Sequence, residues 1–283
     1  MTAVARGLTS LAAIALASGV SAPAQVPAQS AFAFEGTMAQ GGVVIGTAPQ
    51  GTIGLTLDGA DVPVTSDRRF LIAFDRDAAS EATLVAACGD GGTVAHSLTI
   101  SPRVWRIERL NSLPRRGRPT AEFERLRAPE LARIAAARAV LTGSQGWRQR
   151  FIWPATGRLS GLFGAQRIYR GEPGDYHSGT DVARPTGTPV VAPADGVVVL
   201  AAQEPFTLEG RLLIIDHGMG LNSAFLHLSR IDVAVGSRVR QGETVGAIGM
   251  TGRATGPHLH WGMKWRDARI DPLLIAGPMP ATG

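Results

Sequence analysis

The hydrophobic and polar positions of this chain fall into many short apolar runs that are separated by turn residues. Between residues 34 and 102 the runs include GTIGLTL, RRFLIAF, EATLVAAC and TVAHSLTI, which are rich in β-branched residues and divided by Gly, Asp and Pro. Asp58-Gly59, between IGLTL and DVPV, is typical of a β-hairpin turn. We therefore predict a β-rich accessory domain over residues 25–102, folded like a small β-sandwich.

The pattern changes over residues 103–150, where many arginines precede an alanine-rich segment. Pro129 suits the first turn of a helix, Glu130 complements the dipole there, and Gly143 suits the far end. We predict a short, basic helical connector over this range, with its charged face in solvent.

Strand patterns return over residues 151–283. TPVVAPADGVVVLAA places a turn between two Val-rich strands, and RLLIIDHGMGLNSAFLHLS indicates a hairpin that turns around His217-Gly218. GPHLHWGMKW alternates as a further strand does, and no long helix separates these segments. The fold class predicted for the whole chain is mainly β, with antiparallel strands in this C-terminal domain.

Composition narrows the class of protein. Hydrophobic residues make up 45% and charged residues 18% of the 283 positions, which is typical of a globular chain. The formal charge is +5, and Lys264 is the only lysine among 28 basic residues. A positive surface suits an anionic polymer such as acidic cell-wall material, but without interleaved aromatics we expect no nucleic-acid binding. The single cysteine, Cys88, excludes an intrachain disulfide and the thiolate zinc patterns.

The N-terminus has the pattern of an export signal. Arg6 precedes the uncharged apolar stretch LTSLAAIALASGV, and APA follows as a small-residue cleavage site. We predict a signal peptide over residues 1–24 and a periplasmic or secreted protein. The apolar stretch is short for a bilayer, so no stable membrane anchor is expected after cleavage.

Five of the six histidines lie between residues 177 and 260, in YHSGTDVA, DHG, FLHLS and GPHLHWG. Residues two apart on a strand share a face, so His258 and His260 face the same space while Leu259 faces the core. In a straight strand His177 and Asp181 would be about 13 Å apart, too far for one metal ion. Gly179 permits a bend that brings them together.

Imidazole and carboxylate are suitable zinc ligands, and catalytic zinc commonly takes three protein ligands and a water molecule. Such a site also needs a proton acceptor and a group that stabilises the oxyanion. Spacing alone leaves open which of the histidines at positions 217, 227, 258 and 260 bind the metal and which act in acid–base chemistry.

HSGTD, HL after an aromatic strand, and TGPHLHWG together resemble the lysostaphin-type (LytM-like) zinc peptidases that cut peptidoglycan cross-bridges. The resemblance covers about residues 150–275 and includes RLSGLFGAQR and IDPLL. It implies a small antiparallel β core with a narrow groove, for which residues 169–176 and 252–257 are candidate walls. Phe225 departs from the pattern, because the family usually has tyrosine there. We expect the loss of the hydroxyl to alter substrate contacts without removing a metal ligand.

The resemblance further implies one zinc ion in the catalytic domain, bound by His177, Asp181 and His260. It implies that His227 and His258 flank the metal-bound water and stabilise the transition state, whereas His217 is interpreted as structural. The function expected is an exported metalloendopeptidase in which this water hydrolyses peptide cross-links of peptidoglycan.

Peptidoglycan stem peptides are then the expected partner, and an envelope regulatory protein is a further candidate. The alternative function is a non-catalytic LytM-type regulator that activates cell-wall amidases. Because every matching metal and acid–base position is filled in this sequence, the enzyme is favoured over the regulator.

Overall fold

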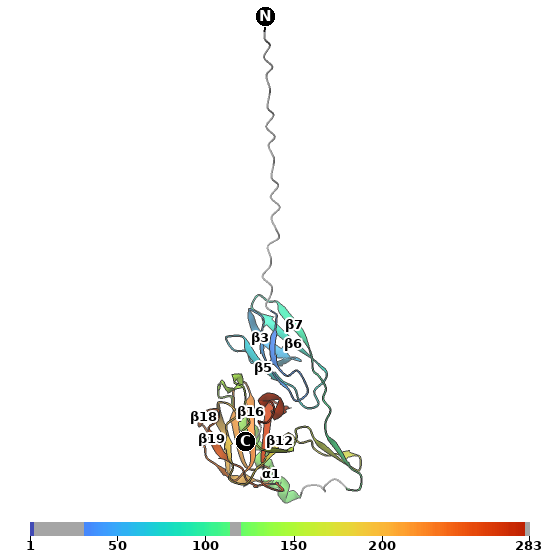
Figure 1. Ribbon diagram of the computed structural model, residues 1–283, viewed down its shortest axis with the longest axis vertical. Coiled ribbons are helices and arrows are strands. Elements are labelled where there is room, and N and C mark those ends of the chain that lie inside the picture. Colours follow the sequence, from blue (N-terminus) through green and yellow to red (C-terminus); the bar gives the residue numbers. More distant parts are fainter. Residues whose placement is uncertain (3–30, 114–119, 281–283) are drawn as a thin grey trace.

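The computed structural model describes residues 1–2, 31–113 and 120–280. An N-terminal β domain lies beside a larger C-terminal β domain (Figure 1). The predicted signal peptide lies, apart from its first two residues, outside the described residues. None of the described helices has the length and apolar character that crossing a membrane requires.

The N-terminal domain consists of two antiparallel sheets whose buried side chains share one core. One sheet has the order β1-β2-β5 and the other β4-β3-β6-β7. Asp58 and Gly59 connect β3 to β4 with φ angles of 48° and 80°, as the hairpin signal predicts. The strands are β1 (Ala33–Gly36), β2 (Val43–Thr47), β3 (Thr52–Leu57), β4 (Ala60–Asp61), β5 (Arg69–Ala73), β6 (Glu81–Cys88) and β7 (Thr93–Thr99).

The C-terminal domain is built on an eight-stranded antiparallel sheet, in which seven strands have the order β18-β14-β15-β16-β20-β12-β9 and the eighth, β21, pairs with β20. The predicted hairpin around His217-Gly218 joins β15 to β16. Leu259 is fully buried, as its alternation with two histidines predicts. The strands are β9 (Arg158–Gly161), β12 (Gly179–Ala183), β14 (Gly196–Phe206), β15 (Gly210–Asp216), β16 (Leu221–Leu228), β18 (Arg238–Val239), β20 (Leu259–Trp265) and β21 (Ala268–Ile270).

Two smaller sheets and two short helical elements complete the domain. One sheet has the order β13-β19-β17, and the other has the order β11-β10-β8 with a parallel pairing of β8 and β10. The elements are β8 (Ile107–Leu110), β10 (Gln166–Tyr169), β11 (Glu172–Pro173), β13 (Pro189–Val191), β17 (Arg230–Ile231), β19 (Thr244–Ala247), a 3-10 helix (Gly146–Arg148) and α2 (Pro272–Ala276). The mainly β prediction is confirmed.

Helix α1 (Ala121–Arg138) differs from the prediction in its start and its surroundings. The prediction that the helix begins at Pro129 is wrong, because Thr120 caps it and Pro129 lies in its interior. The segment before the proline is rich in Ala, Glu, Arg and Leu, which favour helix strongly enough to extend it across that position.

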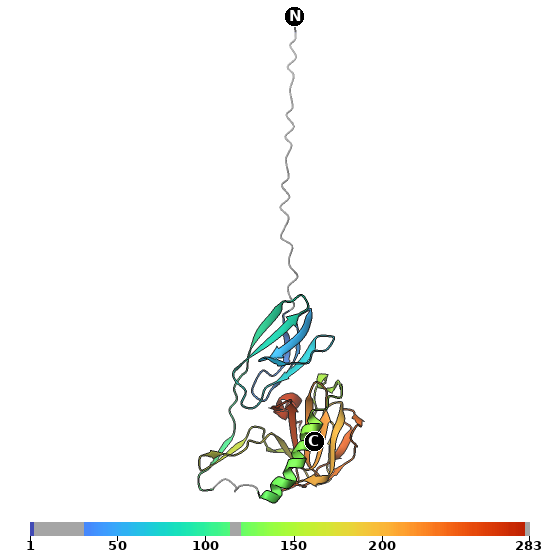
Figure 2. The ribbon, with the colours of Figure 1, turned by 180° about the vertical axis from the view of Figure 1, so that it is seen from behind.

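Most positions of α1 are exposed, in agreement with the predicted solvent-facing charged face, but one side of the helix packs on the C-terminal domain. Figure 2 shows α1 lying across the large sheet, where Ala137 and Ile134 pack with Leu212 and Ile214 of β15. The β8 strand that precedes the helix pairs with β10 of the C-terminal domain. Helix α1 and strand β8 thus both pack on the C-terminal domain. The limits predicted for the accessory domain, the connector and the C-terminal domain stay predictions.

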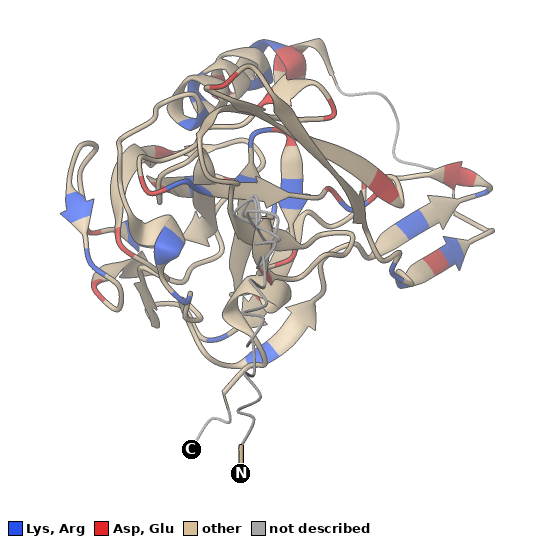
Figure 3. Ribbon diagram, turned by 90° about the horizontal axis from the view of Figure 1, so that it is seen from above, with Lys and Arg blue, Asp and Glu red and all other residues tan. Residues whose placement is uncertain are grey.

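Basic and acidic positions are interspersed over the described ribbon (Figure 3). Several of them pair between distant segments, among them Arg103 with Asp271 at 2.8 Å and Arg148 with Asp67 at 2.8 Å. These two ion pairs join the segment up to residue 103 to the C-terminal domain at separate points.

Candidate metal centre

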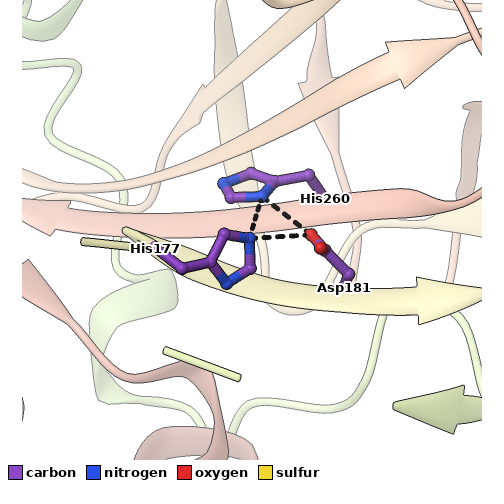
Figure 4. A group of neighbouring side chains, drawn as sticks. All are labelled: His177, Asp181 and His260. Carbon is purple, nitrogen blue, oxygen red and sulfur yellow. Dashed lines mark hydrogen bonds and ion pairs between the residues drawn. The ribbon is translucent and has the colours of Figure 1, made fainter. Parts of the chain in front are cut away.

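Three side chains meet where β12 pairs with β20. Asp181 and His260 are direct partners in the register of these strands, and His177 lies two residues before β12. His177 Nε2 lies 3.0 Å from Asp181 Oδ1 and 3.0 Å from His260 Nδ1, and the last two atoms are 2.9 Å apart (Figure 4). The three positions that the resemblance assigns to the metal are thus brought together.

The hydrogen bond of His177 to the backbone determines which ring nitrogen faces this group. Its Nδ1 lies 3.0 Å from the carbonyl oxygen of Leu162, and a carbonyl only accepts, so Nδ1 carries the proton. Nε2 of the neutral ring therefore presents a lone pair toward Asp181 and His260. His177 Nε2 and Asp181 Oδ1 are then both acceptors, and two acceptor atoms this close repel each other unless a cation or a proton lies between them.

These atoms fit a divalent metal ion. A tetrahedral zinc ion with bonds of about 2.0–2.1 Å holds its ligand atoms about 3.3 Å apart, close to the spacing of this triangle. Two imidazoles and one carboxylate are also a donor set that zinc accepts. The carbonyl of Leu162, which accepts a hydrogen bond from His177 Nδ1, is the kind of outer partner that orients a metal-binding imidazole.

His227 and His258 lie beside this triangle. The ring centroids of His227 and His258 are 4.8 Å apart, and His258 Nε2 is 3.9 Å from Asp181 Oδ1. His227 Nδ1 donates to the carbonyl of Thr251 at 2.8 Å, and His258 Nδ1 donates to the carbonyl of Gly256 at 2.8 Å. These hydrogen bonds place the Nδ1 proton of each ring, so Nε2 is the atom available for proton transfer.

His227 is held in an unusual backbone conformation. Its φ of 63° lies in the left-handed region, which costs a residue other than glycine roughly 1 kcal/mol. Its N–H donates to the carbonyl of Glu209 at 2.8 Å, in the turn between β14 and β15. Arg127 of α1 binds both carboxylate oxygens of Glu209, at 2.6 and 2.7 Å. Helix α1 thus anchors the turn that holds His227.

Burial and the shared carboxylate shift the pKa values of this cluster in different directions. Burial lowers the pKa of His227 to about 4 and also lowers the pKa of His260. For His177, burial acts to lower the pKa, but the hydrogen bond with Asp181 outweighs it and raises the value. For Asp181, burial acts to raise the pKa, but the contacts with the imidazoles of His177 and His260 outweigh it and hold the pKa far below its usual range.

Two glycines allow the metal-binding residues to pack closely. A Cβ atom on Gly161 would lie 2.3 Å from Asp181 Oδ2, and one on Gly179 would lie 2.7 Å from His260 Nε2. Gly179 is in strand β12 and is absent from the residues with positive φ. The lack of a side chain at Gly179 therefore permits close approach to His260, and the predicted bend at this glycine stays a prediction.

Two further residues from the sequence analysis lie in the core. His217 is fully buried, with its Nδ1 donating to the carbonyl of Asp195 at 2.8 Å and its Nε2 2.9 Å from Ser223 Oγ. Its structural interpretation agrees with these contacts. Phe225 is also fully buried and pairs with Trp261 across the sheet, and the effect of its missing hydroxyl on substrate contacts stays a prediction.

The residues that orient the five candidate side chains could not be predicted from the sequence. The carbonyls of Leu162 and Thr251 have no residue-type signal, because any amino acid supplies one. Gly161 was visible only as part of RLSGLFGAQR, and its position opposite Asp181 in the β9–β12 register requires the fold.

The comparisons with known proteins place a peptidase domain at this site. Residues 175–272 match Peptidase family M23, a range that contains all five candidate residues. The chain is 37% identical over 138 residues to peptidoglycan DD-endopeptidase ShyA of Vibrio cholerae, covering 47% of this chain and 31% of that protein. It is 40% identical over 104 residues to DD-carboxypeptidase/endopeptidase Mpg of Neisseria meningitidis, covering 37% of this chain and 24% of that protein. The matched segment thus spans a third or less of these relatives.

A solved structure is similar over most of both chains. A peptidase M23 structure from Pseudomonas aeruginosa superposes with a TM-score of 0.64 and 28% identity, covering 85% of this chain and 96% of that one. The similarity therefore extends over much of the N-terminal domain as well as the family segment. Residues 175–272 thus match Peptidase family M23, in agreement with the resemblance of the C-terminal domain to the lysostaphin-type (LytM-like) metallopeptidases.

Proposed function

We propose that the protein is an exported zinc metalloendopeptidase that hydrolyses peptide cross-links of peptidoglycan. The observation that carries the proposal is the convergence of His177, Asp181 and His260 on one point, with the free Nε2 atoms of His227 and His258 beside it. Similarity to proteins named peptidoglycan DD-endopeptidases supports the substrate class.

Zinc is the metal that best suits this group. His177 Nε2, Asp181 Oδ1 and His260 Nδ1 would hold one ion per catalytic domain, leaving a fourth position open. When bound, zinc lowers the pKa of a coordinated water molecule and polarises a carbonyl oxygen, which is the chemistry that amide hydrolysis requires.

His227 and His258 are suited to move the protons of this reaction. Each ring donates from Nδ1 to a backbone carbonyl, which fixes the tautomer and leaves Nε2 as the reactive atom. An Nε2 that accepts a proton becomes a donor, which can then hydrogen-bond a developing oxyanion or protonate the leaving amine. Because burial keeps His227 neutral near pH 7, this residue begins the cycle as an acceptor.

The substrate is proposed to be the stem-peptide cross-link of the cell wall. The loops 169–176 and 252–257 both lead into the site: the first precedes His177 directly, and the second contains the carbonyl that binds His258. Gly171 and Gly256 in these loops have open space beside them, which suits the approach of an extended peptide. Action on this polymer requires export, for which the predicted signal peptide over residues 1–24 supplies the route to a periplasmic or secreted location.

The alternative function is regulation of separate cell-wall amidases without catalysis. Similarity to a cell division protein, DipM of Caulobacter vibrioides, at 32% identity over 132 residues, keeps this function as an outcome to be tested. The complete ligand triangle and the two adjacent histidines favour catalysis, since a purely regulatory domain has no need of them.

Purified sacculi distinguish the two functions. The zinc-loaded protein and its His227→Ala variant are incubated with sacculi, and the muropeptides are then separated and identified by mass. Conversion of cross-linked dimers to monomers by the wild type alone is the expected result, and the product masses identify the bond. Unchanged dimers, with stimulation of an added amidase by both proteins, would instead support the regulator.

A further inference from the structure

The three proposed zinc ligands are supported unequally by the C-terminal sheet. Asp181 and His260 belong to paired strands, so the backbone hydrogen bonds of β12 and β20 fix their positions. His177 precedes β12 and is held by the segment Leu162–Gln166 instead. Its N–H donates to the carbonyl of Ala165 at 2.8 Å, and its carbonyl accepts from the N–H of Gly164 at 2.8 Å. The position of His177 therefore depends on what holds this segment.

The N-terminal domain contacts this segment through Arg76, which is only 6% exposed. Its Nε donates to the carbonyl of Gly164 at 3.1 Å, and a terminal nitrogen donates to the side-chain oxygen of Gln166 at 3.1 Å. Its guanidinium also lies over the Tyr176 ring, 4.8 Å from the centroid. Gly164 thus links Arg76 to His177 through two consecutive hydrogen bonds.

Asp75, the neighbour of Arg76, contacts the residue that immediately precedes His177. Its Oδ1 accepts from the Tyr176 hydroxyl at 3.1 Å, and Tyr176 immediately precedes His177. Its Oδ2 accepts from the N–H of Arg269 on β21 at 2.8 Å, which connects the contact to the C-terminal sheet. Two adjacent residues of the N-terminal domain therefore fasten both segments that determine where His177 lies.

We propose that the N-terminal domain positions His177, with Arg76 and Asp75 as positioning residues for the metal site. The inference rests on the proposed zinc-binding function of that site. It assigns the accessory domain a part in assembling the metal centre, because the ligand that lies outside the sheet is braced across the domain boundary. Neither residue touches the proposed metal-binding atoms, so each acts through backbone and side-chain contacts to the segments that carry His177.

Removing either contact is expected to weaken metal binding more than it weakens the fold. Substitution of an outer partner that orients a metal-binding histidine typically lowers metal affinity by about 10–100-fold. Arg76→Gln removes the donors to Gly164 and Gln166 together. We therefore expect this variant to bind zinc about 10–100-fold more weakly than the wild type. Asp75→Asn keeps the shape of the side chain and weakens only the bonds to Tyr176 and Arg269, so a smaller loss is expected.

The test measures zinc affinity of the full chain by competition with a chromogenic chelator, alongside thermal unfolding of the metal-free proteins. Arg148→Gln is the matched control, since it breaks an interdomain ion pair with Asp67 that touches no part of the His177 segment. The inference predicts weaker zinc binding by Arg76→Gln and Asp75→Asn, with the control at wild-type affinity.

The outcomes separate this inference from the proposed function. Tight zinc binding by the wild type and both test variants alike would overturn the positioning role and leave the zinc site intact. An equal loss in the Arg148→Gln control would also overturn it, because the effect would then be one of general domain docking. Absence of zinc binding by the wild type would instead refute the proposed function itself. Should Arg76→Gln fail to fold, Asp75→Asn carries the test alone.

Discussion

Replacing Gly161 by alanine tests the packing of the proposed metal site. The added methyl group would meet Asp181 Oδ2 at 2.3 Å, Asp181 Cγ at 2.8 Å and His177 Cε1 at 3.0 Å. Gly161 faces Asp181 across the β9–β12 pairing, so neither backbone moves away easily. The carboxylate must therefore shift by roughly 1 Å to regain van der Waals contact.

A shift of this size exceeds the roughly 0.2 Å within which metal–ligand distances normally fall. We expect Gly161→Ala to lower zinc affinity by about 10–100-fold, which corresponds to about 1.4–2.7 kcal/mol of binding free energy. The measurement is chelator competition with the purified full chain, and circular dichroism verifies that the β fold is retained.

Gly256→Ala is the matched control, because a Cβ atom at Gly256 has no neighbour within 4 Å although the residue lies in a loop of the same site. It should bind zinc as the wild type does. If Gly161→Ala retains wild-type affinity while folding normally, the close packing of Asp181 does not determine metal binding, and the reasoning is refuted.

Three further predictions follow from the same contacts. His177→Ala should lose both zinc and hydrolysis, whereas His227→Ala should retain most of the zinc and lose turnover; near-normal turnover by His227→Ala would refute its acid–base role. Burial lowers the pKa of His217 to about 4. Between pH 6.5 and 4, His217 is protonated in the unfolded chain but remains neutral in the folded protein. The free energy of unfolding should therefore fall by about 3 kcal/mol as the pH drops from 6.5 to 4. Urea unfolding of wild type and His217→Asn across this range checks the sign, and parallel pH profiles would contradict it. Arg127→Gln leaves the carboxylate of Glu209 unpaired at the turn beside His227, so we expect a loss of about 1–3 kcal/mol in urea unfolding; unchanged stability would show that α1 does not anchor this turn.

Local sequence signals were sufficient for the strand-rich architecture. The Asp58-Gly59 hairpin and the turn at His217-Gly218 follow from residue type and alternation alone, and both occur as predicted. Helix α1 shows the limit of such signals. Proline is typical of a first turn, but two contacts with the β14–β15 turn stabilise a helix that continues through Pro129. Arg127 forms an ion pair with Glu209, and Glu130 accepts hydrogen bonds from the N–H and the hydroxyl of Thr207.

The candidate site was predictable in its residues but not in their arrangement. Histidines two apart on a strand must share a face, so the common orientation of His258 and His260 followed from alternation. The approach of His177 to Asp181 did not, because it depends on the segment Leu162–Gln166 and on contacts from the N-terminal domain. Such contacts join residues far apart in the chain, and a periodic pattern carries no information about them.

The most direct test of the account titrates metal against activity. Metal-free protein receives increasing zinc, and hydrolysis of a purified cross-linked muropeptide dimer is followed by mass spectrometry at each step. The account predicts activity that rises in proportion to zinc and reaches its plateau at one equivalent per chain, with no activity in His177→Ala at the same zinc. Equal hydrolysis by the metal-free and zinc-loaded proteins would contradict it.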